Sequence, residues 1–542
     1  MSNPTNRPPA SNNRGRLIFV VGAAIALFAL VHAGRLPREA IPIGLAALIG
    51  IRVSSGLMRK ARATSGAGRV LAYSGGCLGL VASIICFMVL AGLFVRQMNP
   101  MWQQQDRAFR VQKALQVNTM PDRPATNFTS NLPIMVLETD GRGVSRGGQT
   151  VARAKIFGVA NGRASDSATP EYEGLITMHP RGYTSRHLPK QSYTMHTVDE
   201  KNNQTKVSLL GLPKEEDWVL YASFEDKTLM RDVLAFQLTA RMGRYAPRTR
   251  YVELFIKHSG GPLSMRDYEG VYVLMEKIKR SEERVNIAKL EPRHRSEPEI
   301  TGGYIVKRDH GDGGESRFHT EHGGPYFYVY PNDRTITAEQ KSWLSRYFNS
   351  FESALYGPGF RNPQTGYGAY LDVDSFIDAH WLIELGKNVD GFRYSTFLTK
   401  DRDGKLKPEP PWDWNRSFGN ANYYDGWKVN GWYTSNLRHN EISWYNRLRQ
   451  DPEFARRCAA RWLELRKSVF DPRNINASID ELAAQLREAQ ERNFKRWPVL
   501  GVPITCNYYV GDSFQDEVNW LKNWIKDRVE WIDGQVGLPA NL

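Results

Sequence analysis

Two aspartates, Asp390 and Asp413, stand on either side of a predicted β-hairpin. The β-like run 394–400 is followed by the turn sequence Asp-Arg-Asp-Gly at 401–404 and by a second short run over 405–408. Because the chain reverses at this turn, both carboxylates are expected at the open end of the hairpin. Two carboxylates held together beside a glycine turn can provide a proton-accepting base and a ligand for magnesium. The pair is therefore the first candidate for a catalytic site.

The elements that must position this hairpin form a strand-rich half and a helical half. Up to about residue 335 the apolar pattern predicts one helix, from Asp226 to Met242, and strands over 133–137, 151–158, 173–178, 191–197, 251–256 and 271–275. Beyond that point it predicts helices over 339–355, 374–388, 440–468, 477–495 and 514–533. We expect an α+β fold in which the hairpin interrupts the helical half.

The N-terminal part of the chain has the composition of a membrane anchor. Residues 1–15 are polar and rich in Asn, Pro and Arg, which is typical of a disordered tail. Within the predicted membrane segment 16–96, the stretch 70–95 has no charged residue and is long enough to span a bilayer. The stretch 17–33 is also uncharged, with a signal peptide as the alternative interpretation. Residues 97–130 are interpreted as a juxtamembrane linker.

The number of membrane spans decides which side the large domain faces. The N-terminal tail and the segment 52–69 are rich in basic residues, so the positive-inside rule places both in the cytoplasm. That arrangement requires a crossing by the short apolar run 41–51, and it puts the domain on the exocytoplasmic face of a bacterial inner or plasma membrane. If 41–51 does not cross, two spans remain and the domain faces the cytoplasm.

The overall charge and the cysteines limit the classes of partner. The net charge of +15 suits an acidic protein, anionic lipid or phosphate ligands, although basic flanks of membrane spans explain it equally. No nucleic-acid-binding motif is present, so no nucleic acid partner is expected. The four cysteines have no metal-binding spacing, which excludes a zinc site. Cys458 and Cys506 either pair in an oxidising compartment or stay as thiols.

Six short motifs follow one another between Leu132 and about residue 500. They are Arg181-Gly182-Tyr183-Thr184-Ser185-Arg186 with Pro189-Lys190-Gln191-Ser192-Tyr193, Trp218–Ala222 with Asp226–Arg231, Glu269–Glu276, Gly303–Lys307, Asn388-x-Asp390-Gly391, and Trp412-Asp413-x-Asn415-x-x-Phe418-Gly419. In type and order they resemble the motifs of the CotH kinases, which are atypical protein kinases with a two-lobed, kinase-like fold. The resemblance implies a strand-rich nucleotide-binding lobe over 131–335 and a mainly helical lobe with the catalytic hairpin over 336–542.

The resemblance also gives the two aspartates separate roles. Asp390 matches the catalytic aspartate, which accepts or orients the proton of the acceptor hydroxyl. Asp413 matches the metal-binding aspartate. Ser395 stands where ordinary kinases have a second metal ligand, and Asn415 could supply the missing oxygen. The cofactors implied are ATP and Mg²⁺ or Mn²⁺.

The nucleotide-binding residues are assigned mainly by the same resemblance. Arg181, Gly182 and Ser185 would present donors to phosphate oxygens. Lys190, expected on the strand that follows, would reach the α- and β-phosphates. Glu276 ends a strand, where it either orients a lysine or lies at the surface.

The function expected from the sequence is a membrane-anchored kinase that phosphorylates Ser or Thr of a protein partner in the cell envelope. That partner would be acidic or Ser-rich, and the bilayer would be contacted through 17–33 and 70–95. One alternative is a non-catalytic assembly protein on a degenerate kinase fold. Another is a transferase that moves AMP instead of phosphate.

Overall fold

The computed structural model describes most of the chain from residue 120 onward. The described residues are 120–121, 123–125, 127–141, 143–145, 148–183, 185–258, 260–311, 314–436, 444–504 and 506–537, and they belong to the unit Val111–Leu542. The predicted tail, the membrane segment 16–96 and most of the linker lie outside them. Among the described residues, no helix has both the length and the apolar character that crossing a bilayer requires.

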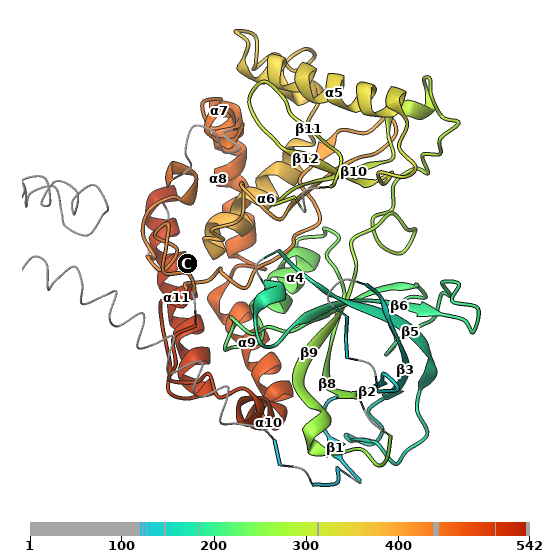
Figure 1. Cartoon of the computed structure of the whole chain (residues 1–542). Helices are drawn as coiled ribbons and strands as arrows, with labels where there is room; N and C mark the ends of the chain where they lie inside the picture. Colours follow the sequence, from blue (N-terminus) through green and yellow to red (C-terminus); the bar gives the residue numbers. More distant parts are fainter. Residues whose placement is uncertain are drawn as a thin grey trace, which may run out of the picture. The chain divides into compact units, whose positions relative to one another are not determined.

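Seven strands of the first half form a closed barrel in the order β2-β3-β5-β6-β7-β9-β8 (Figure 1). They are β2 (Ile134–Glu138), β3 (Thr150–Phe157), β5 (Tyr172–Arg181), β6 (Ser192–Val198), β7 (Asp217–Tyr221), β8 (Thr249–Lys257) and β9 (Tyr268–Glu276). Neighbouring strands run antiparallel except β2 and β8, whose parallel pairing closes the barrel. Apolar side chains such as Met178, Trp218 and Leu254 fill the interior.

A second sheet has the order β11-β12-β10-β13-β14. Its strands are β10 (Tyr304–Arg308), β11 (Arg317–Phe318), β12 (Tyr326–Tyr330), β13 (Thr396–Lys400) and β14 (Leu406–Lys407). β13 and β14 pair antiparallel, which confirms the predicted hairpin. Along its whole length β13 also pairs with β10. Strands from before residue 335 therefore hold the hairpin from after it.

The helices of the unit are mostly in the second half. They are α4 (Arg231–Arg241), α5 (Ala338–Tyr356), α6 (Val373–Gly386), α7 (Trp444–Leu448), α8 (Pro452–Arg466), α9 (Pro472–Leu486), α10 (Ala489–Arg496) and α11 (Phe514–Val536). Two short strands, β1 (Thr129–Ser130) and β4 (Ala164–Ser165), pair separately. The buried helix α6 packs against α4, α8 and α11, and α10 packs against β9.

Several helix boundaries differ from the periodicity for local reasons. The range 440–468 contains two helices, because Asp451 caps the N-terminus of α8 and Pro452 occupies its first turn. The range 477–495 contains α9 and α10. Asp226 does not cap α4 directly. Its carboxylate accepts the N–H groups of Thr228 (3.0 Å) and Arg231 (2.8 Å) and so holds the turn before the helix.

Candidate active site

The end of α6 brings the two aspartate loops together. Lys387 follows the helix in the left-handed region, with φ +44°, so the chain turns sharply there. A Cβ on Gly386 would lie 2.8 Å from the Trp414 ring, and the Phe418 N–H donates to the Gly386 carbonyl at 2.6 Å. Glycine thus allows the loop 412–419 to pack directly on the end of the helix.

Asn388 connects the two aspartates. Its Oδ1 accepts the Asp390 N–H at 3.1 Å, and its Nδ2 donates to the Asp413 carbonyl at 3.2 Å. Ser395, at the start of the hairpin, donates its hydroxyl to Asp413 Oδ2 at 3.3 Å. The expectation that both aspartates lie at the open end of the hairpin is confirmed.

Three residues of this site have a strained backbone. Phe392, Ser395 and Asp413 have φ values of +65°, +50° and +61°, in the left-handed region that side chains disfavour. Each such conformation costs on the order of 1–3 kcal/mol and persists only where the surrounding structure enforces it. Strain of this kind concentrates at functional sites, in agreement with the placement of the two carboxylates.

Both carboxylates of the pair have a raised pKa. Burial raises the pKa of Asp413 to about 7, and the nearby Asp390 carboxylate adds to the rise while Arg416 opposes it. The pKa of Asp390 is also raised, chiefly by burial, against the opposing charges of Arg416 and Arg393. A divalent cation between such groups would restore the ionised forms at neutral pH.

One cleft is lined by three of the four residues expected to bind phosphate. Arg181, Gly182 and Ser185 line it together with Trp412 and Asp413. The structure therefore brings the phosphate-binding candidates and the metal-binding candidate to a single cavity.

Arg181 is the cation of this cleft. It is the last residue of β5, and its guanidinium lies 5.0 Å from the centre of the Trp412 ring. Burial lowers its pKa, while the charges of Asp413 and Asp309 favour its protonated form. The next residue, Gly182, has φ +104°, and a Cβ there would collide with the Ser185 hydroxyl. The turn between β5 and the 3₁₀ helix η1 (Ser185–His187) therefore requires glycine.

Lys190 lies away from this cleft. It precedes β6 rather than lying on a strand, and it is only 2% exposed. Its ammonium donates to the Val271 carbonyl at 2.5 Å and to Asn493 Oδ1 at 2.9 Å, and it lies 4.8 Å from the centre of the Tyr272 ring. Burial lowers its pKa well below the usual value. Lys190 thus joins the barrel to α10 and does not line the cleft with Arg181.

Glu276 is placed in neither of the two expected environments. It is fully buried at the end of β9, so it is not a surface residue, and its partners are not lysines. Its carboxylate accepts the Tyr245 hydroxyl at 3.1 Å and forms ion pairs with Arg248 (2.8 Å) and Arg284 (3.8 Å). The two arginines compensate the buried charge, which makes Glu276 part of the barrel's internal ion pairs.

Asn415 has a free acceptor close to Asp413 in the chain. Its Nδ2 donates to Glu225 at 3.2 Å, while Oδ1 is buried and accepts no hydrogen bond from the described residues. A buried acceptor without a donor is uncommon and indicates a place for a ligand. Carboxylate and amide oxygens are the ligands that Mg²⁺ prefers, so Asp413 and Asn415 suit this metal. Ser395 lies beside Asp413 and contributes only its hydroxyl.

Another acidic group has the spacing of a metal site but is already neutralised. Glu215, Glu216 and Asp217 present carboxylate oxygens within 4.8 Å of one another. The ammonium of Lys279 lies 3.2, 2.8 and 2.6 Å from these carboxylates in turn. This lysine occupies the position that a cation would take.

Two acidic residues near the site were not expected from the sequence. Asp232, in α4, lines the cleft, and its carboxylate accepts the Trp414 N–H at 2.8 Å. Burial raises its pKa to about 8, with a contribution from Asp413. Asp309, directly after β10, adds negative charge that raises the pKa of Asp413. No local motif distinguishes these residues from other aspartates, because their proximity to the site depends on the packing of distant elements.

The comparison with protein families shows to which family the chain belongs. A family model described as CotH kinase protein matches residues 178–532. The chain belongs to this CotH kinase family. The matched range begins within β5, ends within α11 and includes every residue of the cleft as well as both aspartates. No curated protein matches the chain.

The two alternatives for the cysteines are also distinguished: Cys458 is a buried thiol, so the Cys458–Cys506 disulfide is not formed.

Proposed function

We propose that this CotH-family protein is a kinase that transfers the γ-phosphoryl group of ATP to a Ser or Thr hydroxyl of a protein partner. The observation that carries the proposal is the meeting of two groups at one cleft. Arg181 and Ser185 line the cleft together with Asp413, which is tied to Asp390 through Asn388. Phosphoryl transfer depends on positioning and charge neutralisation, and these residues supply both.

Each residue of the site has its own role in the proposed reaction. Asp413 and Asn415 would hold Mg²⁺ or Mn²⁺, which supplies charge neutralisation at the phosphates when bound. Arg181 and Ser185 bind phosphate oxygens from the barrel side. Asp390 accepts the proton of the acceptor hydroxyl as that oxygen attacks phosphorus. Arg416 and Arg393 favour the ionised form of Asp390 that this step requires.

The partner and the location of the enzyme are inferred from the chain's charge and apolar segments. The net charge of +15 supports an acidic or Ser-rich protein substrate. The uncharged stretches 17–33 and 70–95 support an integral membrane protein of the bacterial inner or plasma membrane. The basic flanks of these stretches favour a catalytic domain on the exocytoplasmic face.

The test uses the full chain in detergent with radiolabelled ATP, MgCl₂ and casein as an acidic, Ser-rich acceptor. We expect label from γ-labelled ATP to enter casein, and Asp390→Asn and Asp413→Asn to reduce the rate at least roughly a hundredfold. The matched control is Asp403→Asn, an exposed aspartate in the turn at the opposite end of the hairpin, with φ +55°, a backbone that asparagine tolerates.

Each alternative function has its own outcome in this assay. Label transferred from α-labelled ATP would indicate AMP transfer. No transfer from either nucleotide, with the wild type equal to Asp413→Asn, would favour the non-catalytic assembly protein and refute the kinase proposal.

A further inference from the structure

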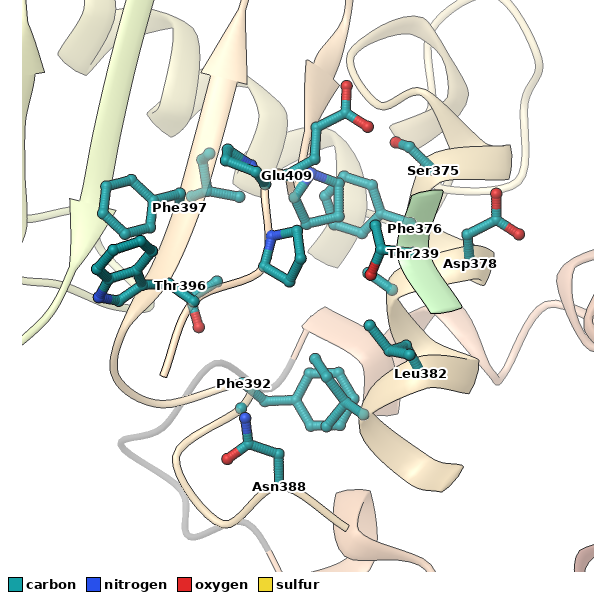
Figure 2. A pocket seen from close by; sticks show the side chains of 18 of the residues that line it. Thr239, Ser375, Phe376, Asp378, Leu382, Asn388, Phe392, Thr396, Phe397 and Glu409 are labelled. Atoms are coloured by element: carbon teal, nitrogen blue, oxygen red, sulfur yellow. The ribbon is translucent and has the colours of Figure 1, made fainter. Parts of the chain in front are cut away.

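A second cavity shares one lining residue, Trp412, with the cleft. It is bounded by the C-terminal end of α4, by α6 and by the hairpin with the segment that follows it. Figure 2 shows the side chains of Phe376, Leu382, Phe392 and Phe397 around this space. Most of its walls are aromatic or aliphatic, which is typical of small-molecule sites.

The charged residues of the lining are paired within the protein. Arg244 donates to Asp378 at 2.8 Å, and Arg461 donates to the other oxygen of Asp378 at 2.7 Å. Glu409 lies 3.8 Å from the ammonium of Lys407 and 4.0 Å from Arg244. Since each of these charges already has a partner, the cavity offers little to an ionic ligand, and a phosphate or carboxylate group is disfavoured there.

Several hydroxyl groups of the lining are already hydrogen-bonded within the protein. Three hydroxyl groups donate to main-chain carbonyls nearby: Thr239 to Ala235 (2.8 Å), Ser375 to Asp372 (2.7 Å) and Thr396 to Tyr394 (3.1 Å). The hydroxyl of Tyr445 is different. The residue is 3% exposed, and its hydroxyl has no hydrogen-bond partner among the described residues. A buried donor without an acceptor indicates a missing partner.

We infer that this cavity binds an uncharged, hydrocarbon-rich molecule carrying one hydrogen-bond acceptor, such as a ketone oxygen, which the Tyr445 hydroxyl satisfies. The apolar walls provide affinity, and the tyrosine selects for the acceptor. Trp412 lines both cavities, so the occupant shares this residue with the cleft of the proposed nucleotide. The binding itself does not depend on the kinase reaction.

The test compares benzophenone with diphenylmethane, which has the same two rings and no carbonyl. The full chain in detergent is titrated with benzophenone and irradiated, and the saturable photolabelled fraction is measured by mass spectrometry. Diphenylmethane is titrated as a competitor. We expect Tyr445→Phe to weaken benzophenone about three- to tenfold, as for one neutral hydrogen bond, and to leave diphenylmethane unchanged within about twofold. Equal effects on both molecules would overturn the role of Tyr445.

A second variant tests the cavity itself. Ala379, half-buried on α6, lines the cavity, and Ala379→Phe should fill it and weaken both molecules at least about tenfold. The matched control is Ala459→Phe, also half-buried on a helix but outside the lining. Both variants are compared in the same detergent, so probe dissolved in micelles contributes equally. Identical binding by wild type and Ala379→Phe would overturn the inference.

The position of the photolabelled peptide tests the site even if Ala379→Phe does not fold. In the wild type we expect saturable adducts within 375–398 or 408–414, which contain most of the lining. Saturable adducts elsewhere only would refute the site.

Discussion

The motif resemblance and the structure assign different cations, Lys190 and Arg181, to the nucleotide. The motif resemblance gives Lys190 the role of the phosphate-binding lysine. In the structure, Arg181 lines the cleft, whereas Lys190 donates to the Val271 carbonyl of β9. We therefore expect Arg181→Met to weaken ATP binding and Lys190→Met to leave it nearly unchanged. Methionine suits both positions, because it keeps an unbranched apolar stem while it removes the charge and the hydrogen-bond donors.

The size of each effect follows from the contacts. A hydrogen bond from a charged donor to a phosphate contributes about 1.5–3 kcal/mol, so the Kd of ATP should rise roughly ten- to hundredfold in Arg181→Met. In Lys190→Met the Val271 carbonyl and Asn493 lose a buried donor, which should lower the free energy of unfolding by about 1–2 kcal/mol. For a domain of this size that is a fall in Tm of about 1–2 °C.

The assay is isothermal titration of ATP with Mg²⁺ into the full chain in detergent, with Tm measured on the same samples. Lys495→Met is the control, since Lys495 is an exposed lysine on α10. If Lys190→Met lost ATP binding at unchanged Tm, while Arg181→Met bound normally, our placement of the nucleotide would be wrong.

Further predictions concern the acidic residues, the metal side and the glycine turn. In EDTA, the free energy of unfolding should fall as pH rises from about 4 to 7. The folded-state pKa of Asp413, about 7, is above its unfolded value, so the native state binds more protons in this window. Thermal unfolding of Asp413→Asn should show a smaller fall, and an unchanged pH dependence would contradict the raised pKa. Asp232→Asn should likewise reduce the loss of stability with rising pH, up to about pH 8, because the folded-state pKa of Asp232 is about 8. Asn415→Ala should raise the Mg²⁺ concentration for half-maximal activity about tenfold, whereas an unchanged requirement would remove Asn415 from the metal site. Gly182→Ala should lower Tm and weaken ATP, because the added Cβ meets the Ser185 hydroxyl; normal binding would show that the turn is not needed.

The parts of the site that could be predicted are those determined by neighbouring residues. The hairpin follows from the turn at 401–404 and the alternation around it, and the convergence of Asp390 and Asp413 follows from the hairpin. The glycine of the Arg181-Gly182 turn is of the same kind, since its φ is a local property. Local sequence patterns carry this information because turn geometry depends on a few adjacent residues.

The parts that could not be predicted depend on distant partners. The environment of Lys190 is created by Asn493, which is 303 positions away in the chain. Closure of the barrel depends on parallel pairing of β2 with β8, for which the sequence has no marker, and β7 was recognised only as a motif. A lysine among apolar residues gives the same local sequence pattern whether its ammonium is buried or solvated.

The support of Asp413 shows why the predicted boundary at residue 335 is not a boundary of folding. The loop that contains Asp413 is contacted by several residues of the first half: Asp232 accepts the Trp414 N–H, Glu225 binds both Asn415 and Arg416, and Arg231 donates to the Ser417 carbonyl at 3.1 Å. In addition, β10 pairs with β13 along the hairpin. The strained backbone of Asp413 is therefore enforced from both halves. A fragment beginning after residue 335 would lose these contacts, and its catalytic hairpin would have no partner strand on the β10 side.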